Sequence, residues 1–319
     1  MAAGLQPSRR EVRAVCRPAD RQRRLGALTR KGWLLFLALC VMWGIPYFLI
    51  KVAVAEVSPA VLVFGRTAIG ALLLLPIAAR SGDLRAAAAH WRWVAAFTVV
   101  EMAVPWLLLS DAERRLPSSL VGLLIAAVPS VAAVLAAAIG QERLDARRAA
   151  GLVVGFAGVA VMLGAGTSFH GAGAFAELAV VVLGYASAPL IVTRRLASVP
   201  SLGVVAISLT LCAAAYAPIA FVTRPAAMPG ADVVAAIVAL GVICTAGAFL
   251  VAFALIAEAG PVRATVVTYV NPAVAALLGT TLLGERFTVG MAAGFALVLA
   301  GSIGATARAA VRSQERAAV

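Results

Sequence analysis

Residues 129–158 read PSVAAVLAAAIGQERLDARRAAGLVVGFAG, and residues 272–301 read PAVAALLGTTLLGERFTVGMAAGFALVLAG. The second stretch repeats the first 143 positions further along the chain, and 12 of the 30 aligned positions are identical. The identities include a proline, a Glu-Arg pair and two glycines: Pro129/Pro272, Glu142/Glu285, Arg143/Arg286, Gly151/Gly294 and Gly158/Gly301. A duplicated half in a very apolar chain is typical of secondary transporters.

The composition places the chain in a lipid bilayer. Hydrophobic residues make up 63% of its 319 residues, charged residues only 13%, and the mean hydropathy is +1.00. A soluble domain carries about 25% charge. The net charge of +13 resides mainly in loops and tails, which indicates topology signals and no nucleic-acid partner.

Ten apolar runs each approach the ~20 residues that a spanning helix needs. They lie at residues 33–54, 60–79, 93–110, 119–139, 149–166, 173–193, 202–222, 233–257, 264–283 and 289–307. Backbone groups in lipid must pair within their own segment, so these runs are predicted to be helices. The predicted fold is therefore an all-α integral membrane protein with ten transmembrane helices.

Lys and Arg counts predict the orientation, because these residues accumulate in cytoplasmic loops. With the N-terminus inside, the cytoplasmic segments hold 21 Lys and Arg residues and the outer loops hold four. Both termini are therefore predicted to be cytoplasmic, with the protein in the inner membrane. Five helices per copy is an odd number, so residues 33–166 and 173–307 are predicted to be inverted repeats around a midplane site.

The tails are basic. Residues 1–32 contain little apolar sequence and are predicted to be a disordered cytoplasmic tail, and residues 308–319 are predicted to be a second cytoplasmic tail. The N-terminal arginines either bind anionic lipid or only anchor the topology. A signal peptide is rejected, because the run Trp33–Ile50 is too long and Lys51 directly precedes the candidate cleavage site.

The first helix contains a proline and two aromatic residues with polar groups. Pro46 removes a backbone donor, so we expect a kink there and another at its repeat partner Pro189. Carbonyls freed at kinks line a substrate cavity or simply accommodate packing. Trp43 and Tyr47 lie one turn apart and form either a substrate wall or an aromatic packing face.

Arg66 and Glu101 are the strongest polar signals, because each lies inside a predicted span, where charge is costly. We hypothesise that Arg66 holds a carboxylate, while Glu101 binds a substrate amine or a coupling proton. The alternatives are an Arg66–Glu101 pair or an Arg66 that reaches the surface. Asn271 either lines the cavity or joins helices, and Lys51 is expected to reach the outer surface.

Other repeated residues are interpreted as structural. Glu142 and Glu285 follow the fourth and ninth helices, where a carboxylate suits the N-terminus of the next helix. Pro129 and Pro272 belong to the same repeated unit. Glycines spaced four apart in the fifth and tenth helices predict close packing within the chain, and a homodimer through them is left open.

Enzyme and cofactor motifs are missing from the sequence. It contains no HExxH, GxSxG, Walker A or GxGxxG pattern. The four cysteines and two histidines are isolated, so no metal site, disulfide framework or catalytic centre is predicted. We expect no enzyme and no cofactor, with a proton as the only coupling species considered.

The duplicated unit resembles the EamA domain of the drug/metabolite transporter superfamily. The matching positions are Trp43-Gly44, Lys51 and Arg66, Pro129 with Glu142-Arg143, and Asn271-Pro272 with Leu283-Gly284-Glu285-Arg286. This resemblance implies a ten-helix permease, commonly a proton-coupled exporter of amino acids or other small metabolites. Arg66 has no counterpart, since Leu209 occupies its repeat position, so the cavity is expected to be chemically asymmetric.

These observations predict an efflux permease in contact with membrane lipid. It would move a small polar metabolite, such as an amino acid or a drug-like compound, by alternating access. The alternative is a membrane scaffold or sensor, which would call for a soluble signalling domain or a large hydrophilic loop. The sequence contains neither.

Overall fold

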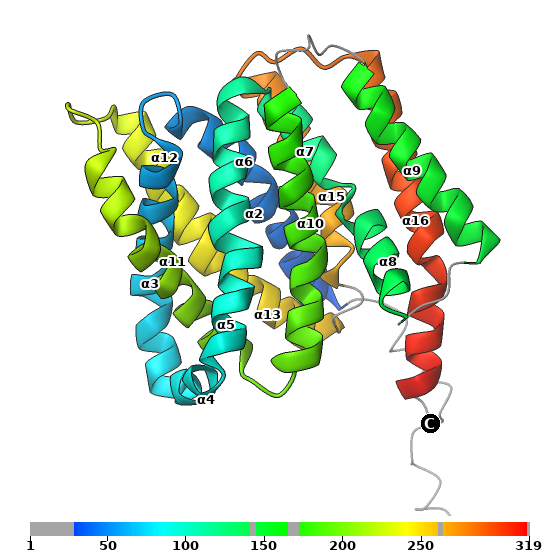
Figure 1. Cartoon of the computed structure of the whole chain (residues 1–319), viewed down its shortest axis with the longest axis horizontal. Coiled ribbons are helices and arrows are strands. Elements are labelled where there is room, and N and C mark those ends of the chain that lie inside the picture. The colour runs from blue at the N-terminus through cyan, green and yellow to red at the C-terminus, as the bar shows by residue number, and fades with distance from the viewer. Residues whose placement is uncertain (1–28, 141–144, 165–171, 261–263, 318–319) are drawn as a thin grey trace, which may run out of the picture.

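The computed structural model describes residues 29–140, 145–164, 172–260 and 264–317, and the regular elements in these ranges are helical. In chain order they are α2 (Arg30–Ala53), α3 (Pro59–Ser81), α4 (Asp83–Ala89), α5 (Trp91–Phe97), η2 (Thr98–Ala103), α6 (Val104–Arg115), α7 (Ser118–Ile125), α8 (Val128–Ala138), α9 (Ala146–Gly164), α10 (Ala172–Arg195), α11 (Ser201–Val222), α12 (Ala231–Gly241), η4 (Val242–Gly247), α13 (Ala248–Ala259), α15 (Val267–Leu282) and α16 (Val289–Ala317). Figure 1 shows them packed side by side as one bundle. The predicted N-terminal tail falls outside the described residues up to residue 28.

Eight helical stretches in the described ranges are long and apolar enough to cross a membrane. Two shorter apolar helices, Val267–Leu282 and Val289–Ala305, occupy the places of the predicted ninth and tenth spans. Many large apolar side chains are exposed on the outside of the bundle, such as Leu72 at 74% and Val153 at 69%. The all-helical membrane class is therefore confirmed, while the number of ten spans stays a prediction.

The two halves of the chain interleave. Three spans pack against their own repeat partners: α3 against α11, the fourth span through α7 against α15, and α9 against α16. The first helix of each repeat packs against the third span of the other repeat. Thus α2 packs against α12 and α13, while its repeat partner α10 packs against α5 and α6. In Figure 1, α3 and α11 run in opposite directions along the bundle.

The bundle has two ends, which we name by residues. The Glu285 end carries the α2–α3, α6–α7, α11–α12 and α15–α16 connections, and the Arg30 end carries the start of α2 and the end of α3. At the Arg30 end, the side chain of Thr29 accepts a hydrogen bond from Gly32 N and so caps α2. At the Glu285 end, Ser58 caps α3 in the same way.

The third span is longer than predicted. The prediction ended it at residue 110 because charged residues follow, but α6 continues to Arg115. Asp111 makes ion pairs with Arg114 at 3.3 Å and Arg115 at 2.6 Å, three and four residues away on the same helix face. Such pairs support a helix rather than a loop. The extra turn also brings Glu113 into the bundle.

Two spans contain a π-helical segment at corresponding positions. Between α5 and α6 lies η2, and between α12 and α13 lies η4. Pro105 follows η2 and cannot donate a backbone hydrogen bond, whereas η4 has no proline near its end. The Tyr216 hydroxyl of α11 donates to the Ala103 carbonyl at the end of η2, at 2.9 Å. Such π segments are frequent at functional sites.

Glycines bring α9 and α16 into backbone contact. A Cβ atom added to Gly158 would lie 2.5 Å from the Gly294 carbonyl oxygen, and one added to Gly151 would lie 2.7 Å from the Ala305 nitrogen. The glycine faces are therefore used within the chain, as the spacing predicted. A homodimer would need a different face.

Candidate functional site

Arg66 is a buried cation in the middle of the bundle. Its side chain projects from α3 and the residue is 4% exposed. Nε and Nη2 donate to Thr245 Oγ1 in η4 at 3.4 and 3.2 Å, and the guanidinium carbon lies 3.8 Å from the centre of the Trp106 ring. Arg66 forms no ion pair within the described residues.

The guanidinium of Arg66 therefore has unused capacity. It carries five N–H donors, and both of its hydrogen bonds go to the same hydroxyl oxygen. The Trp106 ring stabilises the charge through a cation–π contact but accepts no further N–H bond. A carboxylate or phosphate matches the remaining donors of such a planar fork.

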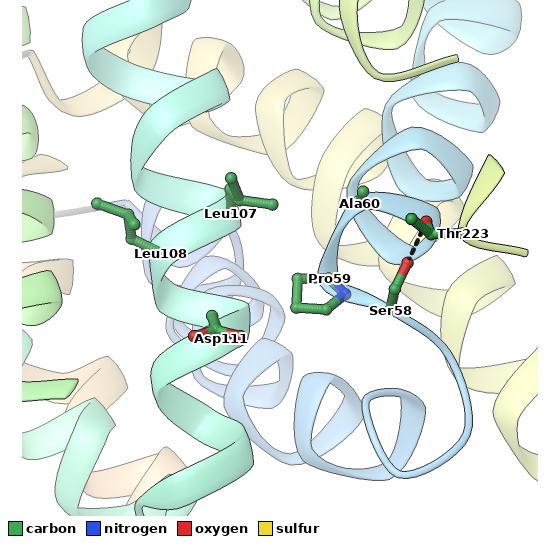
Figure 2. Close-up of a pocket in the computed structure, with 7 residues that line it drawn as sticks. All are labelled: Ser58, Pro59, Ala60, Leu107, Leu108, Asp111 and Thr223. Carbon is green, nitrogen blue, oxygen red and sulfur yellow. Dashed lines mark hydrogen bonds between the residues drawn. The ribbon is translucent and has the colours of Figure 1, made fainter. Parts of the chain in front are cut away.

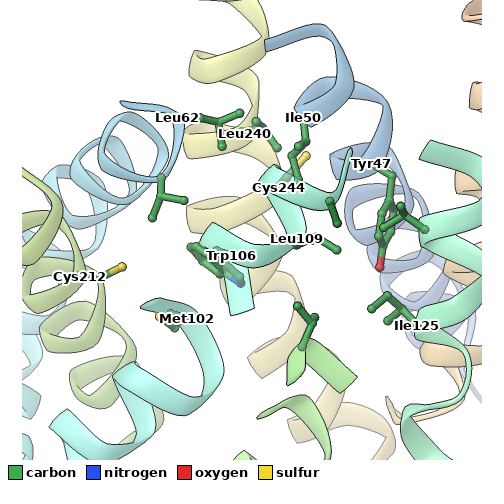
Figure 3. Close-up of a cluster of buried hydrophobic side chains, with 14 of the residues drawn as sticks. Tyr47, Ile50, Leu62, Met102, Trp106, Leu109, Ile125, Cys212, Leu240 and Cys244 are labelled. Atoms are coloured by element: carbon green, nitrogen blue, oxygen red, sulfur yellow. The ribbon is translucent and has the colours of Figure 1, made fainter. Parts of the chain in front are cut away.

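Aromatic residues from three helices surround this cation. Trp106 of α6 and Tyr47 of α2 are buried in the same central cluster (Figure 3). Tyr185 of α10 is half-buried, contacts the Trp106 side chain through its hydroxyl, and interacts electrostatically with Arg66. The site thus combines one cation, two phenol hydroxyls and an indole, contributed by both repeats.

Glu101 lies in η2, in the same span as Trp106. It is half-buried and interacts electrostatically with Tyr185. Its carboxylate has no hydrogen bond and no ion pair within the described residues, so the considered Arg66–Glu101 pair does not form. Glu101 is thus available to a ligand or a proton.

Trp43 and Asn271 pack where α2 meets α13 and α15. Trp43 packs edge-on against Phe249 of α13, with ring centres 6.4 Å apart, and belongs to a separate cluster between α2 and α13. Asn271 is buried in α15, next to Gly44 of α2. A Cβ atom added to Gly44 would lie 2.9 Å from the backbone oxygen of Asn271. Trp43 and Tyr47, expected on one face, therefore enter different clusters.

Glu113 is a buried acidic residue that the sequence analysis assigned to a loop. It is 0% exposed, and neither carboxylate oxygen has a hydrogen-bond partner in the described structure. It interacts electrostatically with Lys51 and Arg66. The missed signal is periodic, because Glu113 continues the buried stripe of Met102, Trp106 and Leu109 at helical spacing.

Lys51 holds the end of the third span. Its Nζ atom donates to the backbone oxygens of Glu113 at 2.5 Å and of Leu116 at 2.9 Å. A cation at a helix C-terminus stabilises the unpaired carbonyls there. The sequence led us to expect that Lys51 reaches the outer surface. In the structure Lys51 instead joins α2 to the end of the third span.

Glu285 caps a helix of the other repeat. Its Oε1 and Oε2 atoms accept from the backbone nitrogens of Ser118 and Ser119 at 2.7 and 2.8 Å. Gly284, at φ +65°, turns the chain so that Glu285 points back into the bundle. The helix it caps is α7, not α16 as the sequence position suggested. Its repeat partner Glu142 lies outside the described residues.

The four singled-out prolines occupy different local settings. Pro46, Pro189 and Pro272 lie within α2, α10 and α15, and the helix assignment continues through all three. Pro46 and Pro272 are buried, whereas Pro189 is exposed. Pro129 lies at the start of α8, after a break at Ala126 and Ala127 that divides the fourth span. Only Pro129 therefore marks an interrupted helix.

A family model for EamA-like transporters matches residues 30–164 and again residues 174–307. The chain belongs to the EamA-like transporter family. The resemblance noted from the repeated motifs is thus confirmed. A solved crystal structure is 23% identical to this EamA-like chain, with 86% of the chain and 97% of the solved chain covered and a TM-score of 0.64, so the two share a fold. No curated protein matches the present chain.

Two shallow cavities open at the Glu285 end of this EamA-like bundle. One, of about 300 Å³, lies between α3, α6 and α11 and is lined by Pro59, Leu107, Asp111 and neighbours (Figure 2). The other, of about 450 Å³, lies between α2, α12 and the end of α15. Arg66 is not among the residues that line either cavity.

The described part of the EamA-like chain contains no group of three or more His, Cys, Asp or Glu residues that could hold a metal ion. Its three described cysteines, Cys40, Cys212 and Cys244, are buried and unbridged. The Arg66 site offers a cation, hydroxyls and aromatic faces, which are groups that bind ligands.

Proposed function

We propose that this EamA-like protein is a permease that moves a small polar metabolite with an anionic group across the inner membrane by alternating access. Arg66 binds the anionic group, and Tyr47, Trp106 and Tyr185 contact the rest of the substrate. The observation that carries the proposal is the burial of Arg66 without a carboxylate partner. An unpaired buried cation is costly in a membrane protein, and a bound anion removes that cost.

The proposed architecture is ten spans in two inverted repeats. The helix pairing supports it, because a pseudo-two-fold axis makes the second, fourth and fifth spans meet their own repeat partners and exchanges the contacts of the other spans between the repeats. The short α15 and α16 would then complete the ten spans. Two repeats that exchange conformations would expose one central site to each side in turn.

The proposed orientation puts the Arg30 end in the cytoplasm, with both termini, because Lys and Arg residues concentrate there. The Glu285 end then faces outward, and polar contacts between helices close it. Besides Lys51 and Glu285, Ser58 and Thr223 hydrogen bond at 2.8 Å, and the Glu56 carboxylate accepts from Gly230 N at 2.7 Å. The structure would thus represent a state closed to the outside.

Amino acids and related metabolites are the proposed substrates, and export is the proposed direction, by family membership. Glu101 remains the candidate for a substrate amine, as the sequence suggested, whereas Trp43 packs α2 against α13 and Asn271 supports α2 from α15. An α-amino acid would place its carboxylate on Arg66. Comparing the flux of each amino acid with that of its N-acetylated form then shows whether transport requires a free amine.

The test is flux from proteoliposomes loaded with a panel of amino acids, N-acetylated amino acids and phosphorylated metabolites, with and without a pH gradient. Wild-type protein should release at least one anionic class. Arg66→Gln should abolish that flux, whereas Arg224→Gln should not, because Arg224 is exposed and stacks on Phe221. Unchanged flux in Arg66→Gln contradicts the site, and no flux of any class favours a scaffold.

A further inference from the structure

Glu113 is the most isolated charge in the described structure. The residue is fully buried, both carboxylate oxygens lack a partner, and its helix places it at the closed Glu285 end. Other buried polar groups without partners are the hydroxyls of Ser118, Ser119 and Ser208, which carry no charge. Burying an unpaired carboxylate costs far more than burying an unpaired hydroxyl.

The charged and titratable groups that face Glu113 come from four neighbouring elements. They are Lys51 and Tyr47 of α2, Arg66 of α3, Tyr185 of α10, and Glu285 after α15. Both cations are engaged elsewhere, since Lys51 bonds to two backbone carbonyls and Arg66 to Thr245. Glu285 adds a like charge, and its own carboxylate is fixed at the start of α7.

A proton resolves this arrangement. Protonation removes the charge of Glu113 without any further partner, whereas an ionised Glu113 would need a cation in direct contact. The only ammonium near enough to move is that of Lys51, which has three donors and uses two on the carbonyls of Glu113 and Leu116. An ionised Glu113 would compete with those carbonyls for Lys51.

We propose that Glu113 is the proton-carrying group of this transporter, protonated while the Glu285 end is closed and exchanging its proton with water when that end opens. This inference rests on the proposed function, because it assigns the coupling proton to a residue next to the Arg66 site. Loss of the proton draws Lys51 onto the carboxylate and away from the end of α6. The hydrogen bond from Lys51 to the Leu116 carbonyl, just beyond the end of α6, is then lost, while α2 and α6 stay joined through the Lys51–Glu113 pair.

The first test is infrared spectroscopy of the full chain in lipid vesicles at neutral pH, with protein closed at the Glu285 end. A protonated carboxylic acid has a carbonyl band that is separate from the carboxylate bands and shifts in D₂O. The band should be present in wild type, absent in Glu113→Gln and retained in Glu101→Gln. Glu113→Asp keeps an acid and should move the band. An identical band in wild type and both Glu113 variants overturns the proposal, and so does its absence from wild type.

The second test is transport. Glu113→Gln mimics the protonated acid, so it should lose pH-gradient-driven accumulation while keeping substrate counterflow, which needs no net proton movement. Lys51→Met is the companion variant, and it should raise reactivity of a cysteine placed at Ser118 toward a water-soluble maleimide. Gradient-driven accumulation by Glu113→Gln at the wild-type level overturns the proposal. If wild type moves no substrate, the proposed function fails, and the infrared band alone decides whether Glu113 holds a proton.

Discussion

The contact between Glu285 and α7 predicts a measurable loss of stability in a single variant. Glu285→Ala removes both acceptors from the backbone nitrogens of Ser118 and Ser119, two buried residues whose nitrogens have no other acceptor among the described residues. A hydrogen bond to a charged group contributes about 1.5–3 kcal/mol, and loss of a helix cap costs about 1 kcal/mol. Glu285 is half-buried, so solvent replaces part of the loss.

We therefore expect Glu285→Ala to lower the free energy of unfolding by about 2 kcal/mol, which is ~3 °C in Tm for a chain of 319 residues. The free energy of unfolding of Glu285→Gln should fall between those of wild type and Glu285→Ala. The glutamine amide oxygen can accept from one backbone N–H, while its NH₂ group faces the other. The assay is thermal unfolding of purified protein in detergent, followed by intrinsic fluorescence.

The matched control for this prediction is Glu258→Ala, because Glu258 accepts one exposed hydrogen bond from Thr29 at the opposite end of the bundle. That variant should change the unfolding free energy by less than about 0.5 kcal/mol. If Glu285→Ala unfolds at the same temperature as Glu258→Ala and wild type, Glu285 does not hold the two repeats together at this end.

Two further predictions concern packing between spans. Gly158→Ala should destabilise the protein by about 1–3 kcal/mol because its new methyl group meets the backbone of α16, whereas Gly164→Ala, with open space around it, should be nearly neutral in the same unfolding assay. Ser130 and Ser302 share a buried hydrogen bond of 2.8 Å, and a double-mutant cycle to alanine should give a coupling energy near ~0.6 kcal/mol, so additive effects would contradict the bond.

The positions of the spans follow from the sequence because lipid imposes length and hydropathy on each helix. The error at the end of the third span has a physical cause. Hydropathy averages over a window, so Asp111, Arg114 and Arg115 hid the fact that Glu113 lies on the buried face. A helical-periodicity reading through residue 113 would have found the residue, although not the isolation of its carboxylate.

Arg66 could be singled out from sequence because a charge within an apolar run has few explanations. Its contacts could not, since Trp106 and Thr245 come from other spans and the repeat offset gives no rule for which helices meet. The same limit applies to Glu285. Its value as a capping carboxylate was visible in its residue type, but the helix that it caps is 166 residues away in sequence.

The asymmetry between the repeats was also visible in advance. Arg66 faces Thr245 and the two buried cysteines Cys212 and Cys244, whereas its repeat position is occupied by the apolar Leu209. The scaffold features repeat in both halves, including the π segments η2 and η4. The chemistry is concentrated in the first repeat and completed by η4 and α10.

The central claim is that Arg66 binds the transported anion. The most direct measurement is counterflow of the best anionic substrate in proteoliposomes containing wild type, Arg66→Gln, Arg66→Lys or Arg224→Gln at matched protein density. We predict full exchange for wild type and Arg224→Gln, reduced exchange for Arg66→Lys, which keeps the charge without the planar fork, and none for Arg66→Gln. Exchange by Arg66→Gln at the wild-type rate would contradict the account.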